Sequence, residues 1–327
     1  MADAKKQGQG TRVEWWCSLD NGFVAEPELT ELTFATRVTG HQATVHLPSV
    51  PSPVRAPAQL GPPTTGSTTS GEPSEEWGEV HHTKSGKASS VVVSRLVLTA
   101  VLAGNDMGVE NSALSICEDM ARWRQDLQTW LEVVTGQHLT TVGHRRTEYI
   151  GYESPIWRIS EDRKMKPYSF PATIDIAQGF VRGVTPEILD KCLQLAADGP
   201  PPLAWVLLRD ARSLADVRQY RRAVIDAATA AELAVTAMLD VRLASTEAKV
   251  REALVEAHRM LGRKMDLLKS LGNPLPPRFE PELVKPRNRA VHDARPVNEG
   301  GCRSAINMAA SVVETAIPLP TPLRRYW

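Results

Sequence analysis

Apolar residues recur with the period of a β-strand along three short stretches near the start of the chain. Val13, Trp15 and Cys17 lie two residues apart, and a similar spacing recurs over residues 32–38 and 43–47. A period of two is typical of strands that bury one face and leave the other in water. This part of the sequence therefore predicts a small antiparallel sheet.

The composition changes sharply between residues 49 and 90, where Pro, Gly, Ser and Thr dominate. Such a segment buries too little apolar area to offset the entropy lost on ordering it. Strand-like residues resume at Val91 and continue to Val101. We therefore expect a disordered insertion within one N-terminal domain rather than a domain boundary.

A helix is predicted after this strand. Ser115 and Glu118 have the spacing of a capping box, and Gly136 is a stop signal. Between them runs an apolar stripe of Met120, Trp123, Leu127, Trp130 and Val134. We interpret its tryptophans as core residues, with an aromatic ligand site as the alternative. A weaker strand pattern over residues 145–175 makes the expected first domain, residues 1–180, an α+β domain.

Helical periodicity dominates the second expected domain, residues 181–327. Thr185 and Pro186 suit the N-cap and first position of its first helix. The pattern then predicts four further helices, over residues 203–211, 214–243, 245–271 and 298–317. Together they predict an all-α bundle, with a short helix between the last two long ones.

Composition and charge narrow the classes of function. The 38 Lys and Arg balance 38 Asp and Glu, which counts against tight nonspecific binding of nucleic acid. The cysteines have no metal-ligand or disulfide-framework spacing. The longest apolar stretch is too short to span a bilayer, and no apolar segment of a secretory signal is seen. We therefore expect a cytoplasmic protein without metal, cofactor or membrane contact. The cysteines are Cys17, Cys117, Cys192 and Cys302.

One carboxylate interrupts the apolar face of the long helix predicted over residues 214–243. Glu232 falls in a stripe with Ala228, Val235 and Leu239. An unpaired charge on a core face costs several kcal/mol, so Glu232 needs a cation or several donors. An internal salt bridge without catalytic meaning is one interpretation, and a role at a functional site is the other.

The strongest candidate for chemistry is the run Lys285-Pro286-Arg287-Asn288-Arg289-Ala290-Val291-His292. Pro286 suits the first turn of a helix, which would place Arg287 and Asn288 near free backbone N–H groups that favour a phosphate. Asn288 and His292 are four residues apart and share one helix face. The amide of Asn288 can then orient the imidazole or grip a substrate with it.

These residue types meet the needs of RNA cleavage without a metal. The attacking 2′-hydroxyl loses a proton and the departing 5′-oxygen gains one, and histidine titrates near neutral pH. Arg287 can stabilise the charge that develops on phosphorus. The alternative is that Arg287 ties helices together and His292 has no chemical role. Five further basic residues predict a solvated face or an RNA-binding rim: Arg251, Arg259, Arg263, Lys264 and Lys269.

The run from Arg287 to His292 resembles the R-N-x-x-x-H signature of the HEPN superfamily, and it lies between the last two long helices. Residues 220–234, which contain Glu232, are similar to the glutamate-bearing helix of bacterial HEPN proteins. The resemblance covers roughly residues 202–318. No comparable motif is seen in the N-terminal half.

The resemblance implies a helical bundle that forms a homodimer, with the two motif helices in one composite cleft. It implies catalytic Arg287 and His292, an assisting Asn288, and Glu232 orienting Arg287. The expected activity is a metal-independent endoribonuclease acting on RNA, as a toxin or phage-defence effector held by an inhibitory partner protein. The alternative is a non-catalytic HEPN module that dimerises and binds nucleotide or RNA.

Overall fold

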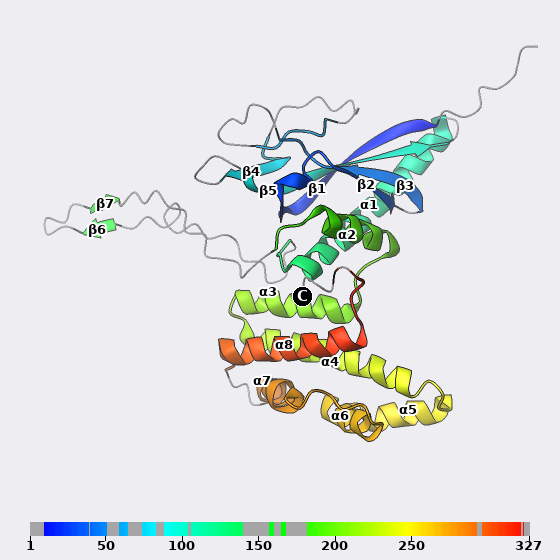
Figure 1. Ribbon diagram of the computed structural model, residues 1–327, viewed down its shortest axis with the longest axis vertical. Helices are drawn as coiled ribbons and strands as arrows, with labels where there is room; N and C mark the ends of the chain where they lie inside the picture. The colour runs from blue at the N-terminus through cyan, green and yellow to red at the C-terminus, as the bar shows by residue number, and fades with distance from the viewer. Residues whose placement is uncertain are drawn as a thin grey trace, which may run out of the picture.

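The computed structural model has a β-sheet at one end and a helical bundle at the other (Figure 1). It describes residues 10–38, 40–50, 59–64, 74–82, 88–103, 106–139, 157–159, 165–167, 182–292, 296–321 and 323. An antiparallel sheet followed by helices confirms the predicted mixture of an α+β N-terminal part and a helical C-terminal part.

The sheet contains five antiparallel strands built around one long central strand. β5 (Ala88–Leu102) pairs on one side with β1 (Thr11–Ala25). On its other side it pairs with β3 (His41–His46) and β4 (Gly78–His82), and β3 pairs with β2 (Thr33–Val38). The predicted strands over residues 12–47 are therefore confirmed. Their alternating residues, including buried Cys17 and Val45, form the inner face.

The prediction of a disordered insertion over residues 49–90 is wrong for two described stretches, 59–64 and 74–82. Leu60 and Trp77 are buried, and β4 adds a strand to the sheet. A few large apolar side chains anchor these stretches, which a composition averaged over forty residues conceals. The other residues of the predicted insertion before β5 lie outside the described part of the chain, apart from 49 and 50.

Two helices cover the inner face of the sheet. α1 (Asp106–Thr135) contacts β1, β2 and β5, and α2 (Pro186–Asp198) contacts α1 and β2. α1 begins before the predicted cap, but the predicted stripe is confirmed: Trp123, Leu127, Trp130 and Val134 are buried. Thr185 caps α2 as expected, by accepting a hydrogen bond from the Ile188 backbone N–H. α2 thus packs on the sheet although its periodicity placed it with the helical region.

A two-stranded hairpin of β6 (Trp157–Ile159) and β7 (Met165–Pro167) lies within the stretch where a weak strand pattern was predicted. Of the residues on which that prediction rested, Trp157 and Ile159 are in β6. The remainder, Tyr149, Tyr152, Ile174 and Ile176, lie outside the described residues.

The helical bundle is centred on α4 (Tyr220–Arg242), which contacts α3 (Leu203–Asp216) and α8 (Glu299–Ala316). The buried surface of α4 is rich in alanine, which lets neighbouring helices approach closely. α3 is longer than predicted and ends where Arg218 takes a positive φ of 61°. The predicted final helix is confirmed, and Asn298 caps it.

The helix predicted over residues 245–271 is two helices, α5 (Ala248–Ala257) and α6 (Leu261–Ser270). His258 ends α5, and its Nδ1 lies 2.8 Å from the Leu254 carbonyl oxygen. α5 contains no buried residue, whereas Leu261 and Leu268 of α6 are buried. The second half of the predicted stripe, on α6, packs against α4, whereas the first half, on α5, is not buried.

The predicted motif helix is α7 (Lys285–His292), but it is not the start of a helical run. The run begins at Phe279 and passes through a π-helical turn, η2 (Glu280–Val284), before α7. Phe279 and Leu283 are fully buried and fix this turn against the bundle. No helix in the described part of the chain is long and apolar enough to cross a membrane.

Candidate functional site

The structure brings Arg287 and Asn288 into contact on the surface of α7. Arg287 Nη1 donates a hydrogen bond to Asn288 Oδ1 over 3.1 Å. Asn288 and His292 are exposed, and Arg287 is partly exposed. No described hydrogen bond joins Asn288 to His292, although the two share a helix face. The amide of Asn288 therefore orients the guanidinium in this structure rather than the imidazole.

The expected position of Arg287 and Asn288 at a helix N-terminus is wrong. They lie eight and nine residues after Phe279, where the helical run begins. Only the first four N–H groups of a helix lack partners inside it. The Lys285 N–H already donates to the Glu280 carbonyl oxygen across the π-helical turn. Any anion at this surface would consequently be held by side chains and not by free backbone N–H groups.

Glu232 pairs with Lys264 rather than with Arg287. Lys264 Nζ lies 3.0 Å from Glu232 Oε1 and also donates to Thr236 Oγ1 over 3.0 Å. The Lys264 side chain is only 10% exposed and that of Glu232 is 31% exposed. Of the two interpretations of Glu232, the internal ion pair is the one that the contacts favour. Lys264 also does not belong to the expected basic rim, because its side chain is buried between α6 and α4.

A pocket of about 400 Å³ lies beside the motif, between the start of α6 and the turn that precedes α7. Arg287 and Asn288 line it together with Arg263, Asp266 and Glu280. His292 does not line this pocket. The pocket therefore places two arginines and an amide around one opening, while the imidazole lies one helical turn further along α7.

The motif helix is held on the bundle by a buried alanine and an arginine from α4. Ala290 is fully buried, and its carbonyl oxygen accepts a hydrogen bond from Arg221 Nε over 2.7 Å. The neighbouring Val291 is 37% exposed. One face of α7 is thus fixed against α4, and the opposite face presents polar motif residues and an apolar side chain to the solvent.

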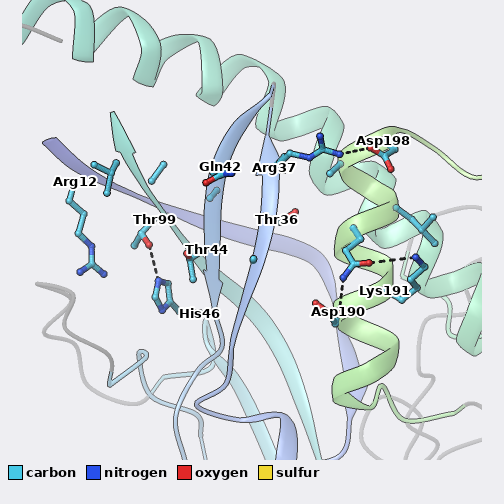
Figure 2. A pocket seen from close by; sticks show the side chains of 17 residues that line it. Arg12, Thr36, Arg37, Gln42, Thr44, His46, Thr99, Asp190, Lys191 and Asp198 are labelled. Carbon is cyan, nitrogen blue, oxygen red and sulfur yellow. Dashed lines mark hydrogen bonds and ion pairs between the residues drawn. The ribbon is translucent and has the colours of Figure 1, made fainter. Parts of the chain in front are cut away.

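A second and larger cavity, which the sequence did not predict, lies on the sheet. It measures about 940 Å³ and is lined by strands β1, β5, β3 and β2 and by the edge of α2. Figure 2 shows Arg12, Thr99 and His46 gathered at one end and Arg37, Asp198, Asp190 and Lys191 at the other. Residues from four strands meet there because cross-strand pairing fixes their register. The alternating pattern predicted this wet face, but not which strands would be neighbours.

His46 is the most enclosed titratable group of this cavity, with 7% of its surface exposed. Its Nε2 lies 2.9 Å from Thr99 Oγ1. Burial, and secondarily the nearby Arg12 guanidinium, lower the pKa of His46 below its ordinary value. The imidazole is therefore a neutral hydrogen-bonding group near neutral pH.

No family model, curated protein or solved structure matches the chain. The described residues also contain no group of three or more His, Cys, Asp or Glu side chains that could hold a metal ion. The assignment of chemistry therefore depends on the motif itself and on the contacts of its side chains.

Proposed function

We propose that the protein is a metal-independent endoribonuclease of HEPN type, with Arg287 and His292 as catalytic residues and Asn288 assisting them. The resemblance of residues 287–292 to the HEPN signature supports this proposal, as does the full or partial exposure of Arg287, Asn288 and His292 on α7. By the same resemblance, the protein acts as a toxin or phage-defence effector that an inhibitory partner holds in check.

The observation that carries the proposal is the electrostatic state of Arg287. Its described partner is the neutral amide oxygen of Asn288, and no ion pair joins it to a carboxylate within the described part of the chain. An amide oxygen fixes the guanidinium without cancelling its charge. The planar donor fork is thus oriented and remains able to bind a phosphate through two hydrogen bonds.

The proposed reaction is an intramolecular transesterification in which the 2′-oxygen replaces the 5′-oxygen on phosphorus. The 2′-hydroxyl oxygen forms a bond to phosphorus as its proton passes to a neutral His292 imidazole. The bond between phosphorus and the 5′-oxygen breaks, and a protonated His292 from a second copy gives that oxygen a proton. Arg287 stabilises the extra negative charge on the phosphoryl oxygens. The products are a 2′,3′-cyclic phosphate and a 5′-hydroxyl.

A homodimer is part of this proposal because one α7 supplies one imidazole. The exposed side chain of Val291 lies beside His292 and offers apolar contact to a second α7. Two motif helices facing each other would place both imidazoles and both guanidinium groups in one cleft. Glu232 has only a supporting place in this scheme. Its described partner is Lys264, and this pair joins α6 to α4 instead of orienting Arg287.

The test is cleavage of labelled single-stranded RNA by purified protein in excess EDTA. We expect wild-type cleavage with cyclic-phosphate ends, and a loss of about 10²–10⁴-fold in His292→Ala. Arg287→Ala should lose a similar factor, and Asn288→Ala less. His82→Ala on β4 and Arg122→Ala on α1 are exposed controls away from the motif helix that should keep wild-type cleavage. Equal rates for wild type and His292→Ala would contradict the proposal.

A non-catalytic module that binds RNA or nucleotide is the second candidate, and one observation favours it. No described hydrogen bond orients the His292 imidazole, whereas a catalytic base is usually held by another group. This candidate predicts no cleavage by wild type but RNA binding that weakens in Arg287→Ala. Binding and cleavage measured on the same RNA separate the two functions.

A further inference from the structure

The cavity on the sheet has the features of a binding site that is independent of the motif helix. Its volume of about 940 Å³ lies at the upper end of the range typical of small-molecule sites. Its lining comes from α2 and from four strands that are far apart in the sequence, and the pairing of the strands brings these groups together. Thr99 pairs with both Glu14 of β1 and Thr44 of β3, so these residues share the outer face of the sheet.

One end of this cavity collects donors suited to an anion. Arg12 lies on the same face of β1 as Glu14, and no described ion pair involves its guanidinium. Thr44 and Thr99 present hydroxyl groups from the next strands. When His46 Nε2 carries the proton it donates to Thr99 Oγ1, and the Thr99 hydroxyl hydrogen can then donate to a ligand.

The other end is rich in groups that hydrogen-bond neutral hydroxyls. Gln194 Nε2 donates to Asp190 Oδ2 over 2.8 Å, and Lys191 Nζ lies 3.5 Å from Gln194 Oε1. Arg37 is paired with Asp198 over 2.7 Å, so this pair adds no net charge. Carboxylate, amide and ammonium groups in one row can both donate to and accept from a polyol.

The lining also excludes some ligands. Apart from the His46 imidazole, the lining contains no aromatic ring, so a nucleobase would find no indole or phenyl face on which to stack. The six apolar residues that line it are four alanines, a valine and a leucine, and such small side chains disfavour a large hydrophobic ligand. A compact molecule with one anionic group and several hydroxyls fits both ends of the cavity.

We propose that this cavity binds a small phosphate monoester of a sugar or polyol, with the phosphate at Arg12, Thr44 and Thr99 and the hydroxyls toward Asp190 and Lys191. A phosphate accepts more hydrogen bonds than a carboxylate and so uses this donor set more fully. The same phosphate chemistry occurs in the backbone of RNA, but the proposal commits to the free small molecule. The site would make the N-terminal sheet a ligand-binding module attached to the helical bundle.

The test is titration of the full chain with ribose 5-phosphate, followed by calorimetry, beside ribose and a short single-stranded RNA. We expect ribose 5-phosphate to bind at least about tenfold more tightly than ribose, because the phosphate contributes the charge-assisted bonds. Arg12→Ala should weaken binding by about tenfold or more, and Thr44→Val by less. Arg122→Ala, an exposed arginine on α1, is the matched control and should bind as wild type does.

Circular dichroism of each variant verifies that loss of binding is not loss of fold. Arg12 is exposed, so its replacement by alanine should leave the fold intact. The His292→Ala variant should bind ribose 5-phosphate as wild type does, which separates this site from the proposed nuclease centre. Absence of binding, or equal binding by Arg12→Ala, would overturn the proposal. So would RNA binding that needs Arg12 when ribose 5-phosphate does not bind.

Discussion

Charged residues are used differently at the junction between sheet and bundle and on the surface of the motif helix. At the junction, Glu132 of α1 is 2% exposed, and its Oε2 lies 2.6 Å from Arg209 Nη1 of α3. Its Oε1 accepts from the Leu139 N–H, and His138 Nε2 lies 2.8 Å from Asp216 Oδ2. On α7, by contrast, the charged and polar motif side chains are wholly or partly exposed.

The difference lies in what burial demands of a charge. A buried carboxylate is tolerated only where a cation and further donors compensate for lost solvation, so each junction group is committed to the fold. An exposed guanidinium bonded to a neutral amide keeps its charge available for a ligand. Partnering and burial together, rather than residue type, therefore distinguish structural charges from candidate functional ones.

The largest effect is expected at the junction. Glu132→Ala leaves Arg209 largely buried with only its neighbour Asp210 as a described partner. We expect a loss of about 3–5 kcal/mol in the free energy of unfolding, measured by denaturant titration. Glu256→Ala, which removes a fully solvated pair with Arg259 on α5, is the control and should change little. Similar losses in both variants would show that burial does not set the cost.

A smaller effect is expected for the ion pair between Glu232 and Lys264. Lys264→Ala removes the hydrogen bonds to Glu232 and Thr236, and we expect a loss of about 1.5–3 kcal/mol in the free energy of unfolding. RNA cleavage, measured where the variant is folded, should stay near the wild-type rate. A fall in cleavage as large as that of Arg287→Ala would place this ion pair within the functional site. Buried, paired charges would then not be purely structural.

Loosening the motif helix should cost less still. Arg221→Ala removes the hydrogen bond to the Ala290 carbonyl oxygen, and we expect about 1 kcal/mol. Hydrogen exchange of the α7 amides should quicken severalfold while that of α8 stays unchanged. Arg222→Ala, one residue along on the same helix, is the matched control. Exchange that quickens equally in both helices would mean that Arg221 acts on the whole bundle.

The pH dependence of stability offers the mildest test and concerns the cavity on the sheet. Burial lowers the pKa of folded His46 below its ordinary value of 6.5, so the unfolded chain takes up a proton more readily. The contribution of neutral His46 is therefore present above pH 6.5 and is lost as the pH falls toward the lower folded pKa. His46→Gln should make the decline in unfolding free energy over this window shallower. An unchanged slope would contradict this role. The charged groups near His46 are Arg12 and Glu14.

The local patterns of the sequence predicted much of the fold. Alternation in β1, β2 and β3, the tryptophan stripe of α1 and the Thr185 cap of α2 follow from neighbouring residues alone. The break between α3 and α4 was predicted at residues 211–214 and lies a few residues later, near Arg218, whereas the break at His258 was not predicted. Leu60 and Trp77 were hidden within a polar composition, although both are buried against the sheet region.

The candidate site was predicted only in part. The motif residues were found, and Arg287 and Asn288 do lie together on α7. The helix N-terminus was misplaced because Pro286 looks like a start, whereas buried Phe279 and Leu283 extend the helical run backwards. Glu232 was recognised as a group that needs a cation, but Lys264 lies 32 residues further along the chain and its pairing depends on packing.

By itself, the sequence determined the order and type of most elements and singled out the residues proposed to perform chemistry. These depend on periodicity, caps and side-chain chemistry, which act over a few residues. Only the tertiary structure decided which charges are paired, where the motif helix begins and that four strands and α2 enclose a cavity. Those features depend on contacts between distant residues, whose register and burial no local pattern specifies.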